Sequence, residues 1–169
     1  KDRAWTWEHQ ALVRARPIVG SDDIIKEFER IRKEVLCTKR DDDKLKEDVK
    51  SMRQKMRQHL DRTSDKLYDI KQGPGGMIDV EFISQYLLLK YAPLKSDFKL
   101  WTDNVRILQE CERLEIIDEN TCKTLIDAYI QIREIYHDLS LADLPRLVSK
   151  EHRLEATFKV EEIYQKLLS

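Results

Sequence analysis

Apolar residues recur every three or four positions along most of the chain, which is the spacing of one face of an α-helix. Residues 22–37 and 125–139 show this pattern most clearly, with charged residues on the opposite side. From Tyr86 to Leu89 the chain is apolar on every side. Because a helix that is apolar all round is usually buried, residues 77–91 predict the central helix of the fold.

Extended along the whole chain, the pattern predicts seven helices at about residues 4–15, 22–37, 45–60, 77–91, 102–114, 125–139 and 149–167. Thr102 and Ser149 are the expected N-caps of the fifth and last helices. In the first helix we expect Trp5 and Leu12, with Trp7 and Val13 beside them, to face the core. Residues 67–71 have an extended character.

Short links between these segments favour neighbours that run in opposite directions. The expected fold class is therefore all-α, a helical bundle of about six or seven mostly antiparallel helices. We expect residues 1–169 to form a single helical domain and to be a fragment of a longer protein. Within it, residues 1–20 are the expected seam with another domain, residues 21–140 the main bundle, and residues 141–169 the C-terminal helix.

Charge, apolar runs and cysteine content argue against several classes of function and location. The net charge is −1, so no overall field attracts the chain to nucleic acid or to a membrane surface. No apolar run reaches the roughly 20 residues of a membrane span, and the charged start lacks the apolar core of a secretory signal. The three cysteines are far apart and lack metal-ligand spacing, which predicts reduced thiols and a cytoplasmic location.

One glycine cluster stands directly before the central helix, in the run Lys71-Gln72-Gly73-Pro74-Gly75-Gly76. Free backbone N–H groups and the positive end of the helix dipole would meet there, beside the ammonium group of Lys71. This combination is one way to bind phosphate. The alternative is that the glycines only turn the chain against a packed core, which is the commoner use of such residues.

Charged residues near this cluster allow further interpretations. Asp79 and Glu81 lie in the first turns of the central helix, where the dipole alone favours carboxylates. Two residues apart, they point about 200° away from each other and do not clamp one metal ion. The end of the third helix is basic, and is either a solvated face or a surface for phosphate or an acidic partner; its candidate partner-binding residues are Arg53, Lys55 and Arg57.

No complete catalytic centre is visible in the sequence. The Asp-x-Asp pattern in residues 41–43 stands among lysines in an expected loop, so we reject it as the metal site of a polymerase-β-type nucleotidyltransferase. The four histidines are scattered, which argues against zinc. We therefore expect no residue of this chain to bind a metal ion.

Three segments together resemble the glutamine synthetase adenylyltransferases. Residues 4–16 read Ala-Trp-Thr-Trp-Glu-His-Gln-Ala-Leu-Val-Arg-Ala-Arg, which is similar to the segment after the nucleotidyltransferase core in that family. Residues 69–82 resemble the family's Lys-x-Gly-x-Gly-Gly block, and residues 101–108 resemble a third block in the same order. The related PII uridylyltransferases have a similar glycine block, whereas the tryptophan-rich opening is more specific.

This resemblance implies an enzyme that transfers AMP from ATP to a tyrosine of glutamine synthetase, and whose other half removes it. Asp79 resembles the adenylylating, C-terminal half, since the deadenylylating half has arginine there. Implied partners are glutamine synthetase and the PII signalling protein. Mg²⁺ and ATP are expected in the whole enzyme, but the metal-binding carboxylates would lie before Lys1, so the fragment alone is expected to be inactive and to bind neither.

By the same resemblance, the candidates for nucleotide binding or for the domain seam are Lys71, Gly73, Gly75, Gly76, Arg14 and Arg16, with Glu8, Asp79 and Glu81 in support. Surface ion pairing is the competing interpretation for the two arginines. Two alternatives to the adenylyltransferase remain: a non-catalytic docking module for glutamine synthetase or PII, and the helical domain of a PII uridylyltransferase.

Overall fold

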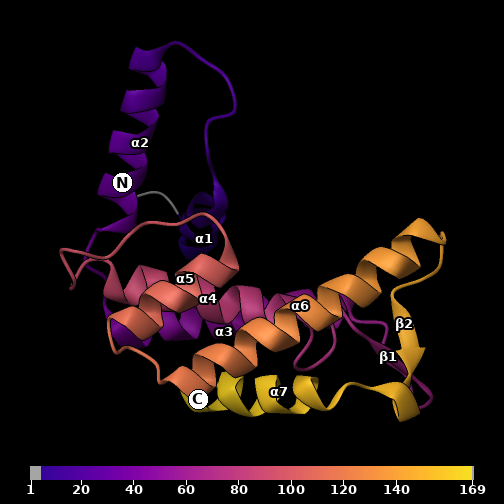
Figure 1. The fold of residues 1–169 in the computed structure, drawn as a ribbon. Coiled ribbons are helices and arrows are strands. Elements are labelled where there is room, and N and C mark those ends of the chain that lie inside the picture. The colour runs from indigo at the N-terminus through magenta and orange to yellow at the C-terminus, as the bar shows by residue number, and fades with distance from the viewer. Residues whose placement is uncertain (1–4, 169) are drawn as a thin grey trace.

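The computed structural model describes residues 5–168 of the chain. It contains seven α-helices, and the all-α prediction is confirmed (Figure 1). They are α1 (Thr6–Arg14), α2 (Asp22–Leu36), α3 (Asp42–Leu60), α4 (Met77–Tyr91), α5 (Asn104–Arg113), α6 (Glu119–Leu141) and α7 (Glu155–Leu168). Ala4, the first residue of the predicted first helix, lies outside the described residues. The division at residues 20 and 140 stays a prediction.

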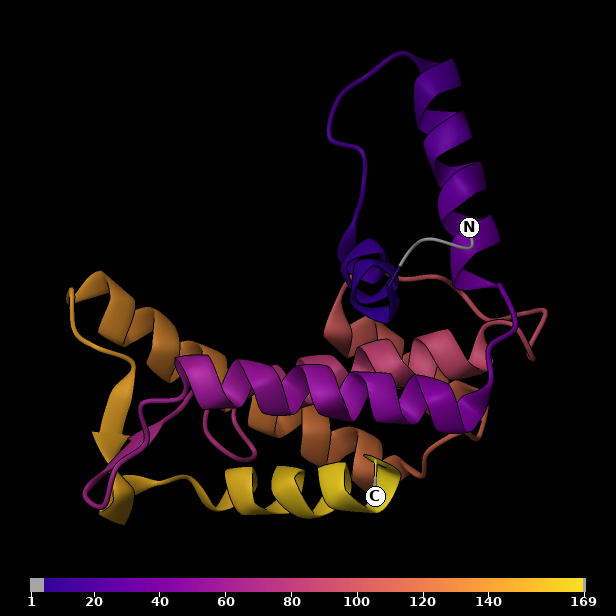
Figure 2. The ribbon, with the colours of Figure 1, turned by 180° about the vertical axis from the view of Figure 1, so that it is seen from behind.

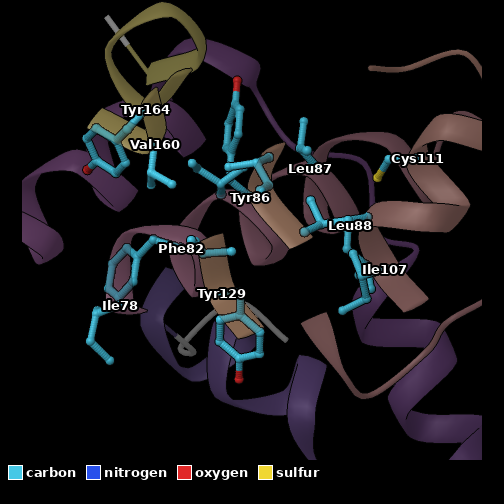
Figure 3. Packing of buried hydrophobic residues seen from close by; sticks show 14 of the residues in the cluster. Ile78, Phe82, Tyr86, Leu87, Leu88, Ile107, Cys111, Tyr129, Val160 and Tyr164 are labelled. Atoms are coloured by element: carbon cyan, nitrogen blue, oxygen red, sulfur yellow. The ribbon is translucent and has the colours of Figure 1, made fainter. Parts of the chain in front are cut away.

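Helix α4 is the centre of the bundle, as its all-round apolar sequence predicts. It packs against α1, α3, α5, α6 and α7, and every residue from Met77 to Leu89 except Glu81 is buried. Figure 3 shows Tyr86, Leu87 and Leu88 of α4 among side chains from the helices around it. A helix buried on all sides fixes its neighbours, so residues at its N-terminal end have well-defined surroundings.

Helix α2 stands away from the other helices for most of its length (Figure 1). Only Arg32 and Leu36, toward its C-terminal end, are buried, whereas Ile24 is 68% exposed. Its regular apolar stripe correctly predicts a helix, but only the last turns of that stripe reach the core.

The two N-terminal tryptophans do not face the core, so this part of the prediction is wrong. Trp5 is 70% exposed and Trp7 is 47% exposed. Helix α1 packs instead through Gln10 and Val13, and the amide of Gln10 donates a hydrogen bond to Gln85 of α4, with 3.2 Å between Nε2 and Oε1.

A small antiparallel sheet joins two distant parts of the chain. Strand β1 (Leu67–Asp69) pairs with β2 (Leu147–Ser149), with Tyr68 opposite Val148. The predicted extended character of residues 67–71 is confirmed for residues 67–69, whereas Ile70 and Lys71 already belong to the following turn. The sequence analysis did not predict β2. Ser149 caps a short 3₁₀ turn (Lys150–His152) and not α7.

The N-cap of α5 also differs from the prediction by one residue. Asp103, and not Thr102, accepts the hydrogen bond from the backbone N–H of Arg106. A carboxylate is a strong acceptor at this position, because it also interacts favourably with the helix dipole.

Candidate functional site

The glycine cluster forms a buried turn between β1 and α4. Its backbone donors are used inside the chain: Gly73 N–H donates to Asp69 O at 2.8 Å and Gly76 N–H to Gly73 O at 2.9 Å. At the start of α4, Met77 N–H donates to Ile70 O at 3.1 Å. In this conformation these N–H groups have acceptors within the chain and are not free to hold a phosphate, so the cluster acts here as a packed turn.

Close packing explains why glycine stands at these positions. Gly75 has φ of +71°, and a Cβ atom there would lie 1.8 Å from the carbonyl oxygen of Thr157 in α7. A Cβ on Gly73 would lie 2.6 Å from the ring of Tyr68. The turn is therefore in direct contact with β1 on one side and with the first turn of α7 on the other.

Asp79 ties the glycine turn to α3. Its Oδ1 accepts from Arg53 Nε at 2.6 Å, and its Oδ2 accepts from Arg57 Nη2 at 2.8 Å and from Gly75 N–H at 2.7 Å. Arg53 also donates to the side chain and the carbonyl oxygen of Gln72. The carboxylate therefore does more than complement the helix dipole: it joins α3, the glycine turn and α4.

The basic end of α3 is not one continuous surface, which corrects the interpretation of its three candidate partner-binding residues. Arg53 is 1% exposed, since its guanidinium group is enclosed with Asp79. Arg57 is 30% exposed, and only Lys55 is fully at the surface. The sequence places Arg53 among other basic residues, and nothing in that pattern distinguishes a buried arginine from an exposed one.

Asp69 is a second buried carboxylate, and the sequence-based analysis missed it. It lies at the end of β1 and accepts from the backbone N–H groups of Lys71 at 3.0 Å and Gln72 at 2.9 Å. Arg146, next to β2, donates to it from Nε at 3.0 Å. Its position immediately before the glycine cluster is the one signal that could have identified it.

Three of the candidate residues connect or cap α1. Arg14 Nη1 donates to Glu81 Oε1 of α4 at 2.7 Å, so these two candidates are brought together. Glu8 accepts from the backbone N–H of Trp5 at 2.7 Å and caps the helix. Arg16 is exposed on the segment after α1. The Arg14–Glu81 pair lies at the surface, where both charges remain partly solvated.

Lys71 points in a different direction from the two aspartates. Its ammonium group lies 4.8 Å from the centre of the Tyr136 ring in α6 and 3.4 Å from the hydroxyl oxygen of that residue. Such a cation–π contact fixes the side chain without neutralising its charge. The positive group therefore remains available beside the glycine turn.

Two properties of residues 5–168 bear on the class of site. No group of three or more His, Cys, Asp or Glu side chains in this range has an arrangement that could hold a metal ion. None of the helices in the same range combines the length and the apolar character needed to cross a membrane.

Comparison with known families divides the chain in two. Residues 36–167 match the family model described as GlnD PII-uridylyltransferase, and residues 1–31 match the model described as glutamate-ammonia ligase adenylyltransferase. The first match runs from the end of α2 to α7, and the second covers α1 and two thirds of α2. Both descriptions name nucleotidyl-transfer enzymes, and the longer match covers well over half of the chain. The chain therefore belongs to the GlnD PII-uridylyltransferase family, as a helical domain related to nucleotidyltransferases that carries an adenylyltransferase-like segment at its N-terminal end.

Proposed function

We propose that this chain is the helical domain of an enzyme that transfers AMP from ATP to a tyrosine of glutamine synthetase. The observation that carries the proposal is the match of residues 1–31 to the glutamate-ammonia ligase adenylyltransferase model. That segment contains the tryptophan-rich helix α1, which is tied to α4 through Arg14–Glu81 and Gln10–Gln85. The adenylyltransferase-like segment is thus built into the bundle.

In this proposal the reacting groups belong to a nucleotidyltransferase domain joined to the present one. The residues described here offer no carboxylate cluster for Mg²⁺, so we assign Mg²⁺ and the ATP phosphates to that other domain. Nucleotidyl transfer depends on positioning and charge neutralisation more than on a protein nucleophile. Arg14, Arg16 and Lys71 would supply positive charge at the seam, and the buried glycine turn would hold Lys71 in place.

The helical domain of a PII uridylyltransferase is a second candidate, because the longer match carries that description. A non-catalytic docking module is less well supported, since Arg53 is buried and cannot contact a partner. Control by the PII signalling protein and a cytoplasmic location belong to the same proposal.

Nucleotide and acceptor choice distinguish the two enzymes. The protein that joins this domain to its nucleotidyltransferase domain should be incubated with Mg²⁺, with ATP or UTP radiolabelled at the α-phosphate, which is the phosphate that is transferred, and with either glutamine synthetase or PII. We expect label from ATP on glutamine synthetase. Label from UTP on PII would favour the second candidate, and transfer to neither acceptor would contradict both.

The role of the seam can be tested in the same assay. We expect Arg14→Gln and Lys71→Met to lower the transfer rate while the protein remains folded, because each removes one positive charge near the proposed seam. Lys123→Gln is the matched control, since Lys123 is an exposed residue of α6. Equal rates for all three variants would mean that Arg14 and Lys71 do not contribute to the transfer reaction, which would then depend on the other domain alone. Gly76→Ala is unsuitable, because its Cβ would lie 2.8 Å from the carbonyl oxygen of Ile70.

A further inference from the structure

Helices α3 and α7 run in opposite directions (Figure 2). A polar groove is lined by residues of both helices. Its volume is about 430 Å³, and it is lined by Lys50, Arg53, Gln54, Arg57, Gln58, Tyr164 and Gln165. The five residues from α3 stand at positions i, i+3, i+4, i+7 and i+8, so they share one side of that helix. Helix contacts in a bundle are normally apolar. A seam lined by cationic and amide groups therefore calls for a separate explanation.

The groove carries an excess of positive charge. Lys50, Arg53 and Arg57 contribute three positive charges. Asp79 beneath them contributes one negative charge and is already shared by both arginines. The difference is a net charge of +2. No ion pair of Lys50 is found within residues 5–168. Partly buried charge of one sign is costly unless a counter-charge is present.

Arg57 has hydrogen-bonding capacity that the chain does not use. It donates to Asp79 only through Nη2. Its Nε is shielded from solvent and has no acceptor in the described part of the chain. An unsatisfied buried donor destabilises the folded state unless it finds an acceptor. Each of the three side-chain nitrogens of Arg53, by contrast, has an acceptor on Asp79 or Gln72, so Arg53 forms a fixed floor.

We propose that this groove binds a phosphate group, either as inorganic phosphate or as a phosphate monoester. Near neutral pH such a group carries about −1.5 to −2 charges, which matches the net +2 of the groove, whereas one carboxylate would balance only half of it. Lys50 and Arg57 hold the anion electrostatically, and Gln54 and Gln58 stand at the exposed rim. The inference rests on the groove itself and holds for either of the two enzyme activities considered above.

Isothermal titration calorimetry of the full chain with sodium phosphate, at constant ionic strength, tests the proposal. We expect saturable binding to one site. Lys50→Gln should weaken it about fivefold, which corresponds to one partly exposed charge pair of about 1 kcal/mol. Lys50 suits this test because it does not contact Asp79. Lys55→Gln removes the same charge from an exposed position outside the groove and should leave the affinity unchanged.

Three results would overturn the proposal. They are the absence of saturable phosphate binding, equal weakening by Lys50→Gln and Lys55→Gln, and acetate binding as tightly as phosphate. A competition titration with AMP identifies the source of the phosphate. Tighter binding of AMP assigns the groove to a phosphate monoester, and tighter binding of inorganic phosphate assigns it to the free ion. Arg57→Gln, checked for folding by circular dichroism, should weaken binding more than Lys50→Gln, because it removes both a charge and the unused donors.

Discussion

Arg53 and Asp79 form an ion pair with 2.6 Å between Nε and Oδ1, and each side chain is only 1% exposed. A pair enclosed to this degree contributes little net stability compared with apolar residues of the same size, but loss of one partner leaves the other charge buried and uncompensated. The pair therefore fixes how α3, the glycine turn and α4 fit together.

Removal of the Asp79 charge should be far more damaging than removal of a surface carboxylate. Asp79→Asn keeps the shape of the side chain but leaves Arg53 unpaired, so we expect a loss of about 3–5 kcal/mol in the free energy of unfolding. Asp97→Asn breaks an exposed pair with Arg113 and should cost less than about 1 kcal/mol. Urea denaturation of the two variants measures both values. Similar losses would mean that burial of the Arg53–Asp79 pair has no energetic consequence.

Gly75 should not tolerate even the smallest side chain. Gly75→Ala places an L-residue at φ of +71° and a Cβ against the Thr157 carbonyl, so at least about 1–2 kcal/mol should be lost from backbone strain alone. Gly20→Ala is the control, because its nearest neighbour is a side-chain atom at 3.7 Å. Hydrogen exchange should show the first turn of α7 opening faster in Gly75→Ala only. Unchanged exchange there would contradict the proposed contact.

The positions of the helices along the chain can be predicted from the sequence far better than which segments pack or pair with each other. The seven helices and the buried centre of α4 are predictable, because periodicity and all-round apolarity are local properties of the chain. The pairing of β2 with β1 is not, since it joins residues about 80 positions apart through three residues each. The exposure of Trp7 likewise depends on how α1 packs against α4, which no local pattern specifies.

In the candidate site, too, some features follow from the local sequence and others depend on tertiary contacts. The glycine cluster identifies the right place, and the opposite directions of Asp79 and Glu81 follow from helix geometry alone. The burial of Arg53 and the role of Asp69 depend on tertiary contacts with Gln72 and Arg146 that no local pattern specifies. The sequence therefore locates the glycine turn, but it does not show whether that turn is an exposed anion-binding site or a buried turn packed between other elements.

Arg153 should be needed as arginine and not merely as a positive charge. Its guanidinium lies 4.5 Å from the centre of the Tyr68 ring and 3.9 Å from that of Phe158, and it donates to the carbonyl oxygen of Pro74 at 2.8 Å. Lysine lacks the planar fork that makes these contacts together. We expect Arg153→Lys to cost about 1–2 kcal/mol in thermal or urea unfolding. Arg30→Lys, in an exposed pair on α2, should change stability much less, and an equal effect of the two would contradict this role.

Stability should fall at alkaline pH because buried acidic groups are held in their neutral forms. Burial raises the pKa of Tyr68 and Tyr164 to about 12 from an ordinary value of 10.0, and that of Cys111 and Cys122 to about 12 from 9.0. The folded chain then binds more protons than the unfolded chain above pH 9.0. Their contribution to stability is complete below that pH and is lost as the pH rises toward 12.

Urea denaturation at a series of pH values from neutral to about 11 should show a steady decline in the free energy of unfolding that steepens above the ordinary pKa of each group. Tyr164→Phe provides the sharpest comparison. It removes one of these ionisations, and among the described residues the Tyr164 hydroxyl has no hydrogen bond that the change would break. We expect this variant to resemble the unaltered protein at neutral pH and to lose less stability at high pH. If the two curves stay parallel throughout, Tyr164 ionises equally easily in the folded and unfolded states, and its burial does not govern the alkaline limit.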